Sequence, residues 1–186
     1  VDGDQVYPLD SIKETVRLAT GITPERTLDE KAEERAIKAL KRFAERLAGM
    51  PRAAVRVVGT NALRVAKNAG PFLRRAEETL GFPIEVISGR EEARLIYLGV
   101  AHSLPLSDQN RLVVDIGGRS TEMILGRAGD PLAAESFGVG CVSLTMRFFA
   151  EGRLTQDAFR FAQVAAGAEF EEALHVFAPE RWREAL

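Results

Sequence analysis

The alternation of helix-like and strand-like segments along the first part of the chain is the feature that most constrains its fold. Apolar residues recur at helical spacing over residues 28–48 and again over residues 70–80, so both segments are predicted to be helices. Runs rich in β-branched residues, at 54–58 and 84–87, are predicted to be strands, the first of them buried. A third helix is predicted over residues 88–100. This order predicts a wound α/β fold.

Local residue choices mark where these helices begin and end. Thr27 and Glu30 have the spacing of a capping box, in which Thr27 caps the first helix. Gly81, followed by Pro83, predicts the end of the second helix, because glycine readily adopts the left-handed conformation that ends helices and proline cannot continue them.

The pattern changes in the second part of the chain. Three strands are predicted at 112–116, 122–125 and 132–136, and glycine-containing turns join them. Two helices are predicted to follow, at 142–149 and 155–175. Three consecutive strands with short turns predict a β-meander.

The segment between these two patterns is the predicted lobe boundary. Residues 101–110 show no periodicity and contain Pro105 and Asp108, which are typical of a connection between compact parts. The predicted division is therefore a first lobe at 1–106 and the start of a second lobe at 107–186.

Charge and cysteine content limit the classes of function. The 25 basic and 27 acidic residues are interspersed, and a net charge of -2 gives no electrostatic footprint for nucleic acid or an anionic membrane. No apolar run approaches the roughly 20 residues that a bilayer-spanning helix needs. Cys141 is the only cysteine, which excludes an internal disulfide and is typical of a reducing compartment, so a cytoplasmic location is predicted.

Residues 113–122 carry the sharpest chemical pattern, in which a buried strand ends in a carboxylate and a turn of glycines and hydroxyl side chains follows. Glycine lets backbone amides approach an anion closely, and hydroxyls add donors, so the turn is predicted to hold phosphate oxygens. A strand follows the turn where a dinucleotide site would need a helix, and the chain has no Gly-Lys-Ser/Thr sequence of the Walker type. A tight hairpin turn without a ligand is the alternative.

Two carboxylates, Asp115 and Glu122, flank this turn. Both could face one hydrated Mg²⁺ that is shared with substrate phosphates. The alternative is that Glu122 is a solvent-facing strand residue.

Two further segments place charged side chains just after predicted strands. Glu91 and Glu92 open a helix, and because neighbours on a helix point about 100° apart, only one of them can face a cleft. The alternative is that both only complement the helix dipole. Arg64 lies one turn into a helix capped near Thr60, where its guanidinium could bind phosphate oxygens; a plain surface arginine is the alternative.

Together these segments resemble those of the exopolyphosphatase and guanosine pentaphosphate phosphohydrolase family, the Ppx/GppA phosphatases of the actin-like ATPase superfamily. The similar segments are Gly-Thr-x-Ala-Leu-Arg at 59–64, Ile-Ser-Gly-x-Glu-Glu-Ala-Arg-Leu-Ile at 87–96, the aspartate-glycine loop at 115–122, and the segment at 136–142. The resemblance implies an α/β, actin-like (ribonuclease H-like) fold with two lobes and mixed sheets.

The resemblance also implies roles for single residues. Arg64 would bind a substrate phosphate, and Glu92 would be the catalytic carboxylate that activates water. Asp115 and Glu122 would order Mg²⁺ and the attacking water, so Glu122 is both a predicted catalytic residue and a predicted metal ligand. The predicted phosphate cradle consists of Gly117, Gly118, Ser120 and Thr121.

The implied reaction is release of terminal phosphate from inorganic polyphosphate by metal-assisted attack of water. Guanosine pentaphosphate is the alternative substrate, and these motifs do not choose between the two. A phosphate-chain sensor without catalysis and an actin-like sugar kinase are the alternatives of another class. A homodimer of the full-length parent protein is a further expectation.

The sequence departs from the family pattern in two ways. Arg119 stands where the family has a third glycine, which adds bulk and positive charge to the loop. The family's first phosphate loop and its later glycine-rich segment have no counterpart, so we expect a fragment that is incomplete at both ends. Positioning and electrostatics supply most of the rate in phosphoryl transfer, so little hydrolysis is expected from this piece alone.

Overall fold

The chain forms two compact units, Val1–Ser88 and Gly89–Leu186, in a computed structural model that describes residues 10–186. The division precedes the predicted boundary at residue 106, because the helix that begins at Gly89 packs on the strands of the second unit. The assignment of 1–106 and 107–186 to two lobes of a larger fold stays a prediction.

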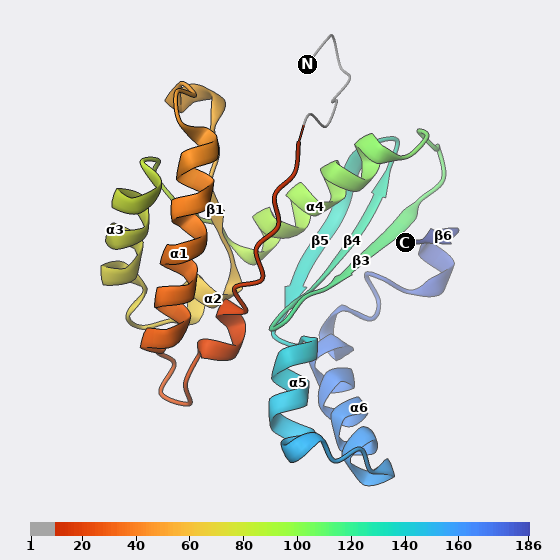
Figure 1. The fold of residues 1–186 in the computed structure, drawn as a ribbon. Helices are drawn as coiled ribbons and strands as arrows, with labels where there is room; N and C mark the ends of the chain where they lie inside the picture. The colour runs from red at the N-terminus through yellow and green to blue at the C-terminus, as the bar shows by residue number, and fades with distance from the viewer. Residues whose placement is uncertain (1–9) are drawn as a thin grey trace. The chain divides into compact units, whose positions relative to one another are not determined.

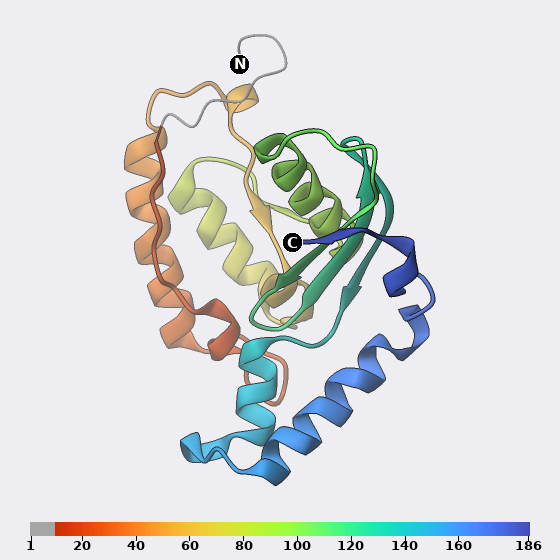
Figure 2. The same ribbon diagram turned by 90° about the vertical axis from the view of Figure 1, so that its right-hand side faces the viewer.

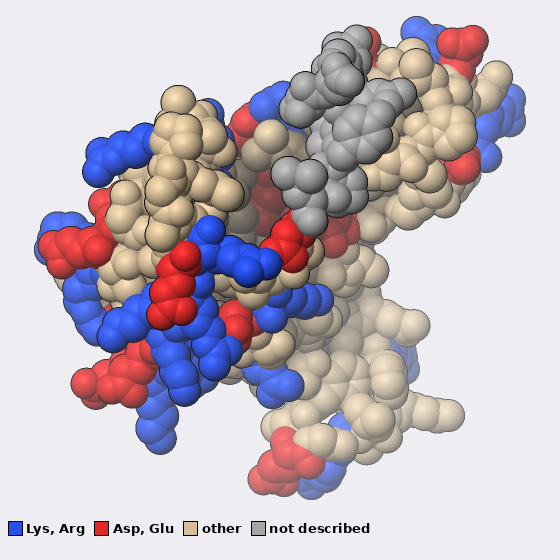
Figure 3. All heavy atoms as spheres, turned by 45° about the horizontal axis from the view of Figure 1, so that its top comes forward, with Lys and Arg blue, Asp and Glu red and all other residues tan. Residues whose placement is uncertain are grey.

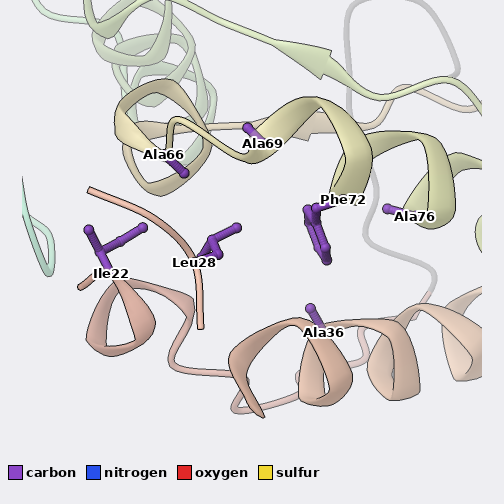
Figure 4. Packing of buried hydrophobic residues seen from close by; sticks show 7 residues of the cluster. All are labelled: Ile22, Leu28, Ala36, Ala66, Ala69, Phe72 and Ala76. Atoms are coloured by element: carbon purple, nitrogen blue, oxygen red, sulfur yellow. The ribbon is translucent and has the colours of Figure 1, made fainter. Parts of the chain in front are cut away.

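The first unit contains three α-helices and two short strands within its described residues. They are α1 (Glu30–Leu47), β1 (Val58–Gly59), α2 (Asn61–Val65), α3 (Ala69–Leu80) and β2 (Glu85–Val86), with 3-10 turns at Leu18–Gly21 and Arg52–Ala54. Its core lies between α1 and α3. Figure 4 shows Phe72 of α3 pointing toward Ala36 of α1, and the small alanine lets the two helices approach closely.

The predicted helices of this unit are confirmed, but the predicted capping residue of the first helix, Thr27, is wrong. The Asp29 carboxylate, not Thr27, accepts the amide of Ala32 at 2.6 Å. The Thr27 hydroxyl instead lies 2.9 Å from the hydroxyl of Thr23 in the preceding loop. Gly81 ends α3 with a positive φ of 81°, as its residue type predicts.

The strand predicted at 54–58 is much shorter than expected. Only Val58–Gly59 pairs, in parallel with Glu85–Val86, and Val58 is 43% exposed rather than buried. A strand extends only as far as its partner, and the partner here has two residues. β-branched composition predicted the strand but carries no information about that length.

The second unit is built on a four-stranded mixed sheet in the order β5-β4-β3-β6. The elements are α4 (Gly89–Ser103), β3 (Arg111–Ile116), β4 (Thr121–Arg127), β5 (Asp130–Phe137), α5 (Cys141–Phe148), α6 (Gln156–Phe170) and β6 (Glu184–Ala185), with 3-10 turns at Ala150–Gly152, Glu171–Ala173 and Pro179–Arg181. The antiparallel meander β3-β4-β5 confirms the three predicted strands. Parallel pairing of β6 with β3 was not predicted. Figure 2 shows the C-terminal segment beside the strands of the meander.

The sheet of this unit is covered on both faces. On one face α4 lies along the meander (Figure 1), where Tyr97 packs with Val113 and Ile124. On the other face Leu112 and Leu125 pack with residues that follow α6. Alternate side chains of the strands therefore lie in two different cores, one on each face of the sheet. The predicted α/β class with mixed sheets is confirmed.

Candidate active site

A row of polar side chains crosses the meander of the second unit at one register position. Asp115 on β3 pairs with Glu122 on β4, and Glu122 pairs with Ser136 on β5. Since alternate residues of a strand share a face, Glu122 lies on the same face as Ile124, which packs under α4. The row therefore lies on the α4 side of the sheet.

Glu122 is the buried centre of this row. Its side chain is 1% exposed, and the Ser136 hydroxyl donates to its Oε1 atom at 2.7 Å. Burial raises the pKa of the Glu122 carboxyl above its ordinary value, while hydrogen bonds with Ser136 and Ser120 lower it and the charges of Glu92 and Asp115 raise it further. The alternative that Glu122 faces solvent is therefore wrong.

The first turn of α4 supplies the third acidic side chain. Glu91 forms a surface ion pair with Arg94 at 2.7 Å, whereas the charge of Glu92 acts on Glu122. The two adjacent glutamates thus have different surroundings, as their angular separation on a helix requires. Glu92, Asp115 and Glu122 form one acidic cluster within the second unit.

The turn between β3 and β4 is a tight four-residue turn in which the amide of Gly117 donates to the carbonyl of Ser120 at 2.9 Å. The Thr121 hydroxyl is buried and donates to the carbonyl of Val139 at 2.7 Å. The Ser120 hydroxyl is buried as well and bonds to Glu122. Both hydroxyls already have protein partners, so backbone amides are the better placed donors for an anion. The role of the two hydroxyls in a phosphate cradle stays a prediction.

An apolar cavity of about 550 Å³ lies beside this turn on the opposite face of the sheet. Phe137, Phe170 and Phe177 are among the residues that line it. A phosphate group placed there would lose its hydration without gaining donors, which costs several kcal/mol by order of magnitude. The acidic cluster on the α4 side is therefore the candidate site for phosphate chemistry.

Arg64 belongs to the first unit, where it joins two of the segments singled out in the sequence. It lies on α2, and its Nη1 atom donates to the carbonyl of Ile87 at 2.9 Å. Next to this bond, the amide of Ile87 donates to the carbonyl of Gly59 at 3.0 Å. The sequence segments 59–64 and 87–88 thus meet in the fold. That Arg64 and the acidic cluster serve one phosphate chain stays a prediction.

The charged surface shows both signs mixed. In Figure 3 basic and acidic side chains lie next to one another, and exposed pairs such as Arg42 with Glu14 join them. Within residues 10–186, no helix is both long enough and apolar enough to cross a membrane.

Comparison with known proteins identifies the family. The sequence model of the Ppx/GppA phosphatase family matches residues 1–186, which is the whole chain. The chain belongs to the Ppx/GppA phosphatase family.

Solved structures of Ppx/GppA proteins have the same fold. An exopolyphosphatase-like protein is 30% identical, with 92% of this chain and 55% of that chain covered and a TM-score of 0.85. An exopolyphosphatase from Cytophaga hutchinsonii is 32% identical over 86% of this chain and 50% of its own, with a TM-score of 0.72. The Ppx/GppA enzyme of Aquifex aeolicus is 32% identical over 86% and 53%, with a TM-score of 0.66. The chain thus spans about half the length of these relatives.

A divalent cation fits the donor set of this Ppx/GppA chain. Among residues 10–186, no three His, Cys, Asp or Glu side chains converge closely enough to hold a metal between them. Mg²⁺ does not need such a cage, because it commonly binds one or two carboxylates and completes its shell with water and substrate phosphates. Exposed Asp115 beside buried Glu122 offers that set, and a cation there would offset the repulsion that Glu92 and Asp115 impose on Glu122.

Sequence reasoning missed Ser136 as a member of the candidate site. Its place next to Glu122 depends on the register between β4 and β5, which shifts at a bulge between Leu125 and Gly126. Serine in a strand carries no chemical pattern of its own, so only the pairing reveals it.

Proposed function

We propose that this protein is a phosphoanhydride hydrolase that releases terminal phosphate from inorganic polyphosphate in the cytoplasm. The observation that carries the proposal is the acidic cluster of Glu92, Asp115 and Glu122 beside the glycine turn. Membership of the Ppx/GppA phosphatase family, which has solved exopolyphosphatase members, supports it. Dimerisation stays a prediction.

In the proposed reaction, one acidic side chain activates water, and the turn and an arginine bind the phosphate. Glu92 accepts a proton from the attacking water, and the water oxygen forms the new bond to the terminal phosphorus. The bond from that phosphorus to its bridging oxygen breaks, and the shortened chain leaves with the bridging oxygen. The backbone of the turn at 117–120 and the guanidinium of Arg64 hold phosphate oxygens.

Asp115 and Glu122 would hold Mg²⁺, which when bound neutralises phosphate oxygens and orients them. Burial of Glu122 and its bond from Ser136 fix the direction of that carboxylate before any ligand arrives. This preorganisation is what electrostatic catalysis requires of a protein group.

A test separates catalysis from binding by changing Glu92 to Gln. We expect Glu92→Gln to bind polyphosphate as the unchanged chain does and to release phosphate about 10²- to 10⁴-fold more slowly, since that is the range that a general base contributes. Phosphate release is measured with the chain in excess over polyphosphate, so that slow turnover is visible. Binding is measured by calorimetry with Mg²⁺ present.

Glu91→Gln is the matched control, because Glu91 neighbours Glu92 in sequence but pairs with Arg94 at the surface. It should leave both binding and release unchanged. Equal release rates for Glu92→Gln and the unchanged chain would contradict the catalytic role. Binding without release in either would support a phosphate-chain sensor.

The choice between polyphosphate and guanosine pentaphosphate needs a separate measurement. The family name covers both activities, and the carboxylates of the acidic cluster act on a phosphate only through a bound cation or a water, so they do not distinguish polyphosphate from a nucleotide. We expect polyphosphate to compete with the nucleotide for the same site. At equal concentration, phosphate should be released faster from polyphosphate than from the nucleotide. A preference for the nucleotide would make guanosine pentaphosphate the substrate.

A further inference from the structure

The segment at 138–143 has no role in the proposed function, yet its backbone forms hydrogen bonds to the turn at 117–120. The amide of Cys141 donates to the carbonyl of Gly117 at 3.0 Å. The amides of Val142 and Ser143 both donate to the carbonyl of Gly118, at 2.7 and 3.0 Å. The first amides of α5, which a helix cannot satisfy internally, are thus satisfied by the turn.

These bonds fix the direction in which the turn presents its own amides. A trans peptide is planar, and its carbonyl and N–H point in opposite directions. None of the described peptide bonds is cis. Because the carbonyls of Gly117 and Gly118 point at α5, the N–H groups of Gly118 and Arg119, which belong to the same two peptides, point away from it. Successive amides that point to one side form a concave donor surface for an anion.

Gly140 makes this contact possible through its lack of a side chain. A Cβ atom at this position would lie 2.6 Å from the amide nitrogen of Arg119 and 2.7 Å from the carbonyl oxygen of Gly117. Both are backbone atoms, which cannot rotate away. The φ of Gly140 is -157°, an extended value that any residue adopts, so the need for glycine comes from space and not from backbone strain.

The Ser143 hydroxyl secures the same position. Its Oγ atom accepts the amide of Gly140 at 3.0 Å and donates to the carbonyl of Gly140 at 2.9 Å. The Ser143 side chain therefore restrains the backbone of Gly140, which contacts the turn.

We propose that Gly140 and the first turn of α5 are positioning elements for phosphate binding, which orient the amides of the turn at 117–120 toward the substrate. The proposal rests on the proposed function, because it takes a phosphate chain as the ligand. It gives the segment that follows β5 a specific task in that site.

The test compares two glycines of one segment. Gly140→Ala must push the turn away, which moves the amides of the turn out of hydrogen-bonding position. We expect tripolyphosphate with Mg²⁺ to bind Gly140→Ala at least about tenfold more weakly than the unchanged chain, because losing even one hydrogen bond to a charged phosphate oxygen weakens binding by about that factor. Gly138→Ala is the control, because its added Cβ would meet Glu169 at 3.5 Å, an ordinary contact, and it should bind as the unchanged chain does.

Amide NMR spectra of the same variants report the position of the turn without a ligand. In Gly140→Ala the resonances of residues 117–120 should shift. The resonances of β3 and β4 should keep the chemical shifts of the folded chain. Unchanged affinity in a folded Gly140→Ala chain would overturn the proposal. If that variant does not fold, Ser143→Ala decides, because it keeps the glycine and removes the hydroxyl bonds; affinity equal to that of the unchanged chain would then overturn the proposal.

Failure of the proposed function would look different. An unchanged chain that binds neither tripolyphosphate nor guanosine pentaphosphate would refute the function. The positioning claim would then depend on the spectra alone, and it would fail if the turn resonances of Gly140→Ala coincided with those of Gly138→Ala.

Discussion

At the scale of single residues, Glu122 carries the clearest electrostatic consequence. Burial is the main cause that raises its pKa above the ordinary value of 4.5, so the folded chain holds this proton to higher pH than the unfolded chain does. Between those two values the folded state binds more protons, and stability therefore falls as pH rises through that window. The contribution of protonated Glu122 to the stability of the folded chain is fully present only below the ordinary pKa of 4.5.

Glu122→Gln should remove this loss, because glutamine stays neutral and its carbonyl can still accept from Ser136. In buffer free of divalent cations we expect Glu122→Gln to be more stable than the unchanged chain at pH 8, and the difference to shrink as pH falls toward 4.5. Urea unfolding is followed by Trp182, the only tryptophan, which packs in the core of the second unit.

Two comparisons check this prediction. Glu91→Gln, which changes a partly exposed glutamate, should shift stability by no more than about 0.5 kcal/mol at any pH. Added Mg²⁺ should stabilise the unchanged chain more than Glu122→Gln. If the unchanged chain were more stable than Glu122→Gln at pH 8 without Mg²⁺, the buried carboxylate would not destabilise the fold, and the prediction would be wrong.

How far the sequence predicts a residue's role depends on whether that role is local. Local patterns placed Asp115 at the end of a strand and Glu91 and Glu92 at the start of a helix, whereas the choice of Glu92 came from the family resemblance. The inward bond of Thr121 to Val139 joins residues 18 positions apart, and nothing in the turn indicates it. The same holds for Ser136, whose contact with Glu122 exists only through strand register.

At the scale of elements, the contact of α4 with β4 depends on one small residue. A Cβ at Gly126 would lie 2.1 Å from the Cζ atom of Tyr97, which is 3% exposed in the core between helix and sheet. Gly126→Ala should therefore destabilise the second unit by about 1–3 kcal/mol, the range for overpacking a core. The measurement is urea unfolding followed by Trp182 fluorescence.

Gly99 in the same helix supplies the matched control. Nothing lies within 4 Å of a Cβ built there, so Gly99→Ala meets no obstacle. It should stabilise the chain by about 0.5–1 kcal/mol, because alanine loses less backbone entropy in a helix than glycine does. Destabilisation by Gly99→Ala, or none by Gly126→Ala, would contradict this account of how α4 packs.

Elements were predicted from sequence where their ends are chemically marked. Gly81 ends α3 and the glycine turn separates β3 from β4, and both limits are close to the predicted ones. Strand β6 has two residues and pairs with a strand some 70 positions earlier, as the bond of Arg111 to Glu184 illustrates. No periodicity can arise in two residues, so its pairing was visible only in the structure.

At the scale of the whole molecule, each unit has its own core and its own part of the predicted phosphate chemistry. The first unit carries Arg64 and the second carries the acidic cluster. The net charge is -2, and on the face drawn in Figure 3 basic and acidic side chains lie next to one another. Since a chain with this net charge has no overall attraction for a polyanion, we expect polyphosphate to bind through a few local groups.

If polyphosphate binds through a few local groups, the location of an arginine matters more for binding than the number of arginines. Arg64→Ala should weaken polyphosphate binding about 10- to 150-fold, because a hydrogen bond to a charged group contributes about 1.5–3 kcal/mol. The double change of Arg42 and Arg46 to Ala removes twice the charge, yet both form exposed ion pairs, with Glu14 and Asp10. We expect that variant to bind within about twofold of the unchanged chain. Calorimetry at two salt concentrations measures both, and equal weakening by the two variants would mean that polyphosphate binds the surface diffusely rather than at a site.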